Sequence, residues 1–193
     1  MGMLILGLVI FLGVHSVRVF ADGWRTRACA RLGENRYKGL YSLASVLGFV
    51  LIIYGFGAAR LQPTVLWGSP TWTRHLAALL TIPAFVLVVA AYVPGNGIKA
   101  RLHHPMILGV KTWALAHLLA NNTLAELLLF GGFLAWSVLA FIAARKRDRV
   151  GNVSYPPGRL GPTLITVAIG LLAWAGFAFW AHAAWIGVRP FGG

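Results

Sequence analysis

Six long apolar runs constrain the fold of this chain more than any other feature of its sequence. They cover roughly residues 2 to 20, 39 to 58, 75 to 93, 104 to 120, 123 to 143 and 162 to 186. A helix of about 20 apolar residues crosses the hydrocarbon core of a bilayer, and a helix pairs its own backbone polar groups there. The runs therefore predict an all-α, polytopic membrane helix bundle of about six transmembrane helices. We find no repeat and no second domain, so residues 1 to 193 are expected to form one transmembrane domain.

Composition supports a membrane location for the chain. Of its 193 residues, 59% are hydrophobic and 11% are charged, whereas soluble domains carry about 25% charged residues. The first apolar run has no basic segment ahead of it and no clear cleavage site after it, so we expect it to remain as the first helix. The single cysteine, Cys29, lies in a basic connection expected to be a loop. One cysteine excludes an internal disulfide, a cysteine metal cage and the C-x-x-C-H attachment of c-type haem.

The basic residues alternate between connections and predict an orientation. The chain has 17 Lys and Arg against 4 Asp and Glu, and 14 of the 17 lie near the first, third and fifth connections. The other three are Arg60, Arg74 and Arg189. By the positive-inside rule the odd connections are cytoplasmic and both termini lie outside, whereas five helices would place a strongly basic loop on the wrong side. Because these residues separate apolar runs, we expect them to meet anionic lipid headgroups and predict no nucleic-acid partner.

Histidines are the polar residues that need explanation. There are six, all within or at the ends of predicted helices: His15, His75, His103, His104, His117 and His182. Polar groups at membrane depth are costly unless they have a partner, so each is a candidate functional residue. His75, His103 and His104 lie at helix ends, where an interfacial or hydrogen-bonded role suffices. His15 and His117 lie deeper and favour a functional role.

The stretch "HHPMILGVKTWALAHLLANN" places Trp113, His117 and Asn121 on one stripe at helical spacing. Imidazole is a common ligand of haem iron, and helix bundles build cofactor sites from side chains on facing helices. Zinc and a proton relay are weaker hypotheses, because Glu126 is the only carboxylate inside a predicted span. The alternative for His117 is a hydrogen bond to a neighbouring helix. We expect Trp113 to pack against a macrocycle, and Asn121 to cap the helix or bond a pocket group.

Several segments, taken in order, resemble the NnrU family over nearly the whole chain. They are "GVHSVRVF", "YKGLYSLASVLGF", "WTRHLAALL", "ARLHHPMILGVKTWALAHLLANN", "LLLFGGFLAW" and "HAAWIGV". NnrU proteins are bacterial inner-membrane proteins associated with nitrite and nitric oxide metabolism in denitrifiers. They are similar to the plant zeta-carotene isomerase, which carries haem b in the membrane and uses it to isomerise a carotenoid double bond.

The resemblance implies haem b and places its axial ligands on His15 and His117. The isomerase has a cysteine three residues before the second histidine, where this chain has Ala114, so a thiolate ligand switch is not expected. His75, His104 and His182 also match family positions, without an implied role. By depth, at 1.5 Å per residue, His15 falls about 7 Å inward of the midplane and His117 about as far outward. On that measure His117 pairs better with His182 or His75, and His15 with His104, so His182 is the substitute ligand.

Three functional classes remain open at this point. The first is a haem-dependent membrane enzyme, an isomerase or redox catalyst, acting on a lipid-soluble substrate. The second is a haem protein that passes electrons to a redox partner or senses nitric oxide. The third is a non-catalytic membrane factor that assembles or regulates denitrification enzymes. Similar architecture can host different chemistry, so the resemblance does not choose among them.

Overall fold

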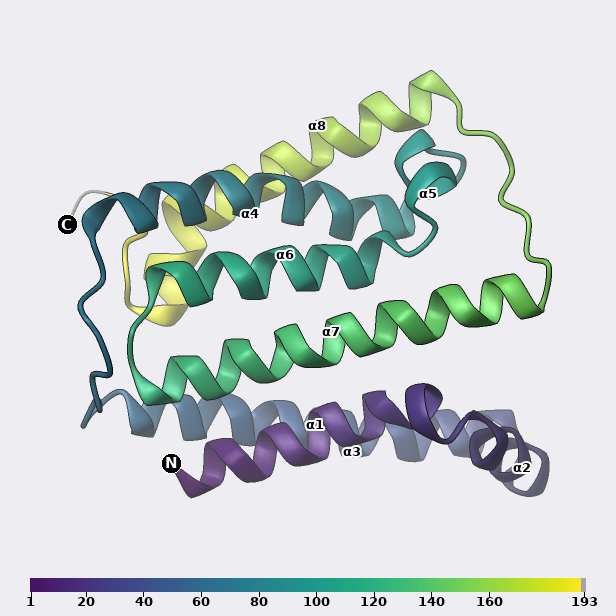
Figure 1. The fold of residues 1–193 in the computed structure, drawn as a ribbon, viewed down its shortest axis with the longest axis horizontal. Helices are drawn as coiled ribbons and strands as arrows, with labels where there is room; N and C mark the ends of the chain where they lie inside the picture. Colours follow the sequence, from purple (N-terminus) through teal and green to yellow (C-terminus); the bar gives the residue numbers. More distant parts are fainter. Residues whose placement is uncertain (192–193) are drawn as a thin grey trace. The chain divides into compact units, whose positions relative to one another are not determined.

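The computed structural model describes residues 1 to 191, and within them it contains helices and no strands. The α-helices are α1 (Gly2–Phe20), α2 (Asp22–Leu32), α3 (Glu34–Ala59), α4 (Thr71–Tyr92), α5 (Gly97–Leu102), α6 (Pro105–Ala120), α7 (Leu124–Val150) and α8 (Leu160–Gly176). A π-helix, η1 (Phe177–Ile186), continues directly from α8 (Figure 1). The predicted all-α membrane architecture is confirmed.

Five helical segments within residues 1 to 191 are long and apolar enough to cross a membrane. They are α1, α3, α4, α7 and the continuous segment Leu160–Ile186. The remaining predicted span, residues 104 to 120, corresponds to α6, an apolar helix of 16 residues. At 1.5 Å per residue it is about 24 Å long, which is shorter than the roughly 30 Å of a bilayer core. The placement of both termini outside stays a prediction.

Two basic segments expected to be loops are helical instead. Residues 22 to 32, which contain Cys29, form α2, and the basic run from Arg145 to Arg149 extends α7 to Val150. Arginine, lysine and alanine are good helix formers, and long basic side chains can keep their charges in water while their stems cover apolar surface. The ends of the apolar runs therefore did not mark the ends of the helices.

The chain divides into two compact units, which are described separately. One comprises Met1–Gly68 and Asn122–Ala143, and the other comprises Ser69–Asn121 and residues from Ala144 onward. The division falls within α7, whose residues up to Ala143 belong to the first unit.

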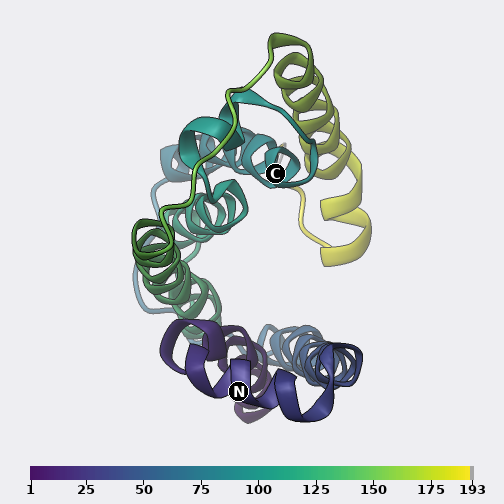
Figure 2. The same ribbon diagram turned by 90° about the vertical axis from the view of Figure 1, so that its right-hand side faces the viewer.

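In the first unit, α1 and α3 lie side by side (Figures 1 and 2). Small residues permit this close approach: an added Cβ on Gly48 would lie 2.7 Å from the Phe11 nitrogen, and one on Gly7 would lie 2.6 Å from the Ile52 nitrogen. Gly48, Ile52 and Gly55 are buried on one face of α3. This face is a small-residue packing surface of the kind that lets membrane helices approach closely.

In the second unit, α4 packs against both α6 and α8. Glycines again set the contact distance, because an added Cβ on Gly109 would lie 3.0 Å from the Ala84 carbonyl oxygen, and one on Gly170 would lie 2.7 Å from Val86 Cα. α4 therefore forms the centre of this unit and carries His75 near its first turn.

Candidate functional site

His15 lies on α1 and is oriented by its own helix. Its Nδ1 is 2.7 Å from the Phe11 carbonyl oxygen, one turn earlier. A carbonyl can only accept, so the proton is on Nδ1 and the neutral ring carries its lone pair on Nε2. This is the form in which an imidazole binds a metal through Nε2, with the other nitrogen held by a carbonyl.

Aromatic rings surround His15 within the first unit. Its ring stacks on Phe11 at a centroid distance of 4.3 Å, lies 5.3 Å from Tyr41 of α3 and meets Trp136 of α7 edge-on at 6.0 Å. The Trp136 indole nitrogen is buried, and within residues 1 to 191 it has no hydrogen-bond partner. Buried donors are normally paired, so this N–H is a feature that a bound molecule with an acceptor atom would explain.

His117 in the second unit repeats the arrangement of His15. Its Nδ1 is 2.9 Å from the Trp113 carbonyl oxygen, and the two rings lie 5.2 Å apart. By the same reasoning the lone pair of the neutral ring is on Nε2. The Asn121 side chain donates to the His117 carbonyl oxygen at 2.8 Å and lies at the C-cap of α6. Asn121 therefore caps the helix, which is one of its two predicted roles.

The other three candidate histidines differ from one another. His182 in η1 has its Nδ1 2.7 Å from the Val188 carbonyl oxygen, so it has the same tautomer as His15 and His117. The His75 ring is exposed and makes no hydrogen bond among residues 1 to 191. His104 is the exception, because its Nε2 lies 2.8 Å from Asp148 Oδ2 and donates to it. With its proton on Nε2, His104 is the least suited of the set to bind iron through that nitrogen.

Comparison with known proteins gives one decisive result. A model of the NnrU family, described as NnrU protein, matches residues 3 to 190. The chain belongs to the NnrU family. No curated protein and no solved structure matches it significantly. The NnrU match spans both compact units, and together with the apolar helices it identifies an integral membrane protein.

A polar cluster in this NnrU-family chain was missed by sequence reasoning. Asp148 Oδ2 accepts from His104 Nε2 at 2.8 Å and from the Tyr155 hydroxyl at 3.1 Å, and the Arg145 guanidinium lies 3.8 Å away. Arg145 also donates to His103 Nδ1. The His103 ring stacks on Tyr155 at 4.1 Å with an interplanar angle of 4°. The cluster joins the end of α7 and the following loop to the junction of α5 and α6.

A strained turn brings the two histidines of this cluster together. His103 has φ 67° and ψ −48°, and the His104 N–H donates to the Leu102 carbonyl oxygen at 2.8 Å. This is a γ-turn with positive φ, a rare and strained conformation. It allows consecutive imidazoles to approach one carboxylate, since His103 Nδ1 is also 4.0 Å from Asp148 Oδ2. The available signal was Asp148 itself, a lone acid in the basic run "RKRDR".

Burial, followed by the Asp148 carboxylate, raises the pKa of Tyr155 above its ordinary value. Burial and a neighbouring negative charge both disfavour the phenolate. Tyr155 is therefore neutral across the physiological range and acts as a hydrogen-bond donor to Asp148.

Glu126, the carboxylate inside a predicted span, has a structural role at the start of α7. Its Oε2 accepts from the Thr123 N–H at 2.9 Å and the Thr123 hydroxyl at 2.8 Å, and it lies 3.2 Å from the Asn122 nitrogen. This arrangement satisfies N–H groups at the helix start, as a capping box does. Among residues 1 to 191, no group of three or more His, Cys, Asp or Glu side chains is arranged to hold a metal ion.

Proposed function

We propose that this NnrU-family protein is a haem b protein of the bacterial inner membrane, with the imidazoles of His15 and His117 as the groups that would hold the iron. The observation that carries the proposal is the shared local geometry of the two histidines. Each donates its Nδ1 proton to the carbonyl four residues earlier, at 2.7 Å for His15 and 2.9 Å for His117. With the proton on Nδ1, Nε2 is the atom of each neutral imidazole that would hold a metal.

The surroundings of His15 fit a flat, apolar macrocycle. Phe11 and Tyr41 present ring surfaces at 4.3 and 5.3 Å from the imidazole, and the Trp136 N–H offers a donor that has no partner among residues 1 to 191. A haem bound here would supply one-electron redox chemistry and iron coordination of small ligands. The protein's own part is to fix the ring orientation through the Phe11 carbonyl and to exclude water with aromatic side chains.

His117 has matching support within the second unit. Its ring centroid lies 5.2 Å from that of Trp113, one turn earlier on α6. The Phe11 ring has the same position relative to His15 on α1. We propose that Trp113 packs against the macrocycle. His182, which has the same tautomer, remains the substitute ligand.

The family resemblance supports a role in nitrite and nitric oxide metabolism during denitrification. We place the protein there as a redox catalyst or isomerase acting on a lipid-soluble substrate. The alternative is a non-catalytic membrane factor for denitrification enzymes, which needs no iron. Haem content therefore decides between these functions.

The test is the optical spectrum of detergent-purified protein from haem-replete cells, oxidised and reduced, together with its pyridine haemochrome. We expect a Soret band and a b-type haemochrome. His15→Ala and His117→Ala should each abolish the Soret band or change the iron spin state while leaving the protein folded. His104→Ala is the matched control, because His104 Nε2 already donates to Asp148, and its spectrum should equal that of the wild type.

Three outcomes would change the proposal. Wild-type protein that purifies without haem would favour the assembly factor. Unchanged spectra in both histidine variants would exclude this pair and make His182 and His75 the next ligands to test. If only His104→Ala loses the Soret band, His104 at the junction of α5 and α6 would become the candidate iron ligand.

A further inference from the structure

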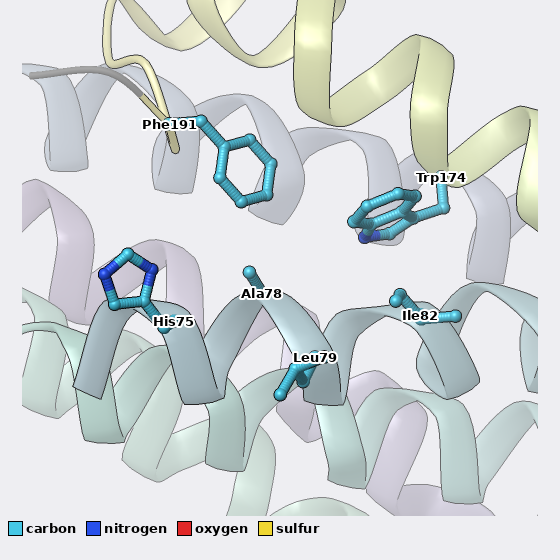
Figure 3. A pocket seen from close by; sticks show the side chains of 6 residues that line it. All are labelled: His75, Ala78, Leu79, Ile82, Trp174 and Phe191. Atoms are coloured by element: carbon cyan, nitrogen blue, oxygen red, sulfur yellow. The ribbon is translucent and has the colours of Figure 1, made fainter. Parts of the chain in front are cut away.

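A hollow of about 290 Å³ lies in the second unit, lined by α4, α8 and the C-terminal segment. Figure 3 shows its lining: His75, Ala78, Leu79 and Ile82 from α4, Trp174 from α8, and Phe191. Binding sites for small molecules are typically apolar concavities of about 300 to 1,000 Å³ with a few polar groups. The hollow is at the small end of that range and suits a single ring system.

Among the described residues of this lining, the His75 imidazole is the polar group that remains available to a ligand. The Trp174 indole N–H donates to the Thr81 hydroxyl at 3.0 Å, so its hydrogen-bonding capacity is used. The His75 imidazole makes no hydrogen bond among residues 1 to 191, and Figure 3 shows its ring at one end of the hollow beside Phe191. None of the six lining residues is Lys, Arg, Asp or Glu. The lining therefore selects for an uncharged molecule.

The apolar surfaces beside the hollow indicate entry from the bilayer. Leu79, which lines the hollow, is 64% exposed, and it belongs to α4, a helix long and apolar enough to cross a membrane. His75 is the fifth residue of α4, and Ile82 lies seven residues further along the helix. At 1.5 Å per residue this is about 10 Å. The His75 imidazole thus lies near the end of the span, and the apolar residues Ala78, Leu79 and Ile82 line the hollow further along α4.

We propose that this hollow binds the headgroup of a lipid-soluble quinone. A quinone carbonyl accepts a hydrogen bond from the His75 N–H, the flat ring lies against Trp174 and Phe191, and the hydrocarbon chain follows Ala78, Leu79 and Ile82 to the lipid. Aromatic side chains favour flat partners. A fatty acid or phospholipid headgroup would bring a permanent charge to a lining that contains no Lys or Arg to neutralise it.

The structure of the adjoining segment supports a binding role. Trp174 is followed within three residues by η1, a π-helix of ten residues. π-helical turns are rare and are frequent at functional sites. Here the π-helix leads directly into the C-terminal segment that places Phe191 over the hollow, with Trp174 and Phe191 6.2 Å apart.

The experiment measures quenching of tryptophan fluorescence by decylubiquinone in phosphatidylcholine nanodiscs containing the full chain. We expect saturable quenching in the wild type and its loss in Trp174→Phe. Trp72→Phe is the matched control, since Trp72 lies on α4, is 61% exposed and is not part of the lining. It should retain saturable quenching.

Variants of His75 test the hydrogen bond itself. His75→Phe keeps a flat ring without an N–H and should weaken binding about three- to tenfold, the value of one neutral hydrogen bond. His75→Gln restores a donor and should recover most of the affinity. Ala78→Leu fills the hollow without removing a hydrogen bond and should abolish saturable binding. This variant tests the same site independently if Trp174→Phe does not fold.

The proposal is overturned if His75→Phe binds as tightly as the wild type, if decylbenzene, which lacks oxygen, competes equally with the quinone, or if Ala78→Leu still binds. It does not depend on haem. If the protein binds quinone but contains no haem, the quinone proposal stands and the proposed haem function is refuted. If the protein contains haem but does not bind quinone, the haem function stands and the quinone proposal is refuted.

Discussion

Replacing Gly48 by alanine tests the packing that holds His15 in place. An added Cβ would lie 2.7 Å from the Phe11 nitrogen and 3.0 Å from its Cα. Both are backbone atoms, which cannot rotate away. Carbon contacts normally lie at about 3.5 to 4.0 Å, so α1 and α3 must separate locally by about 1 Å. Overpacking of this kind costs about 1 to 3 kcal/mol.

Gly57→Ala on the same helix is the matched control. Its added Cβ meets nothing within 4 Å, so the substitution should be neutral or stabilise by about 0.5 to 1 kcal/mol through helix propensity. The assay is thermal unfolding of both variants in one detergent. At about 2 to 4 °C per kcal/mol for a chain of this length, the Tm of Gly48→Ala should be several degrees below that of Gly57→Ala.

The same variant should perturb the haem site if the proposed ligand is correct. Phe11 is the residue displaced, and its carbonyl oxygen holds His15 Nδ1. We therefore expect a shifted or broadened Soret band in Gly48→Ala and a wild-type band in Gly57→Ala. Equal Tm values for the two variants would refute the close approach of α1 and α3. A lower Tm with an unchanged Soret band would refute the link from this interface to the iron.

The remaining predictions concern a cap, a titration and an orientation. Glu126→Ala should lower stability by about 1 kcal/mol, as loss of a helix cap does, measured by the same unfolding assay. The pKa of Tyr155 is raised beside Asp148. The contribution of neutral Tyr155 to stability is therefore complete below about pH 10, the ordinary tyrosine pKa, and is lost as the pH rises through the pKa of the folded state. Between neutral and strongly alkaline pH, Tyr155→Phe should lose less stability than the wild type. A membrane-impermeant thiol reagent applied outside intact cells should not label native Cys29 but should label Gly68→Cys in a Cys29→Ser background, and external labelling of Cys29 would reverse the predicted orientation. Cys29→Ser should leave the haem spectrum unchanged, because a histidine-only ligand set does not use the thiol.

Apolar length predicts five of the six spans, because a bilayer core requires about 20 apolar residues per helix, whereas the predicted span at residues 104 to 120 is a helix of 16 residues. The small-residue face of α3 was also predictable, since Gly48, Ile52 and Gly55 share one side of a helix by spacing alone. The helix ends were not. α2 and the last turns of α7 are basic segments whose helices form outside the apolar runs, where hydropathy gives no signal.

Site chemistry was predictable only where it is local. The depth of His15 and His117 in the membrane stays a prediction from their positions in apolar runs, and the bond of each to the carbonyl four residues earlier lies within a single helix. The cluster around Asp148 depends on a γ-turn at His103 and on contacts between segments more than 40 residues apart. No sequence period encodes such a convergence. The sequence therefore assigned His103 and His104 to helix ends and missed Arg145 and Tyr155.

The bond between His15 Nδ1 and the Phe11 carbonyl has a consequence for biogenesis. Both partners belong to α1, so the imidazole is oriented as soon as this first helix forms during insertion, before α3 or α7 has entered the bilayer. A side chain set by its own helix loses little entropy when iron arrives. A synthetic peptide of residues 1 to 21 in micelles should already show the Nδ1–H tautomer by nitrogen NMR, and the nascent chain would then present a preorganised imidazole to haem before synthesis of the bundle is complete.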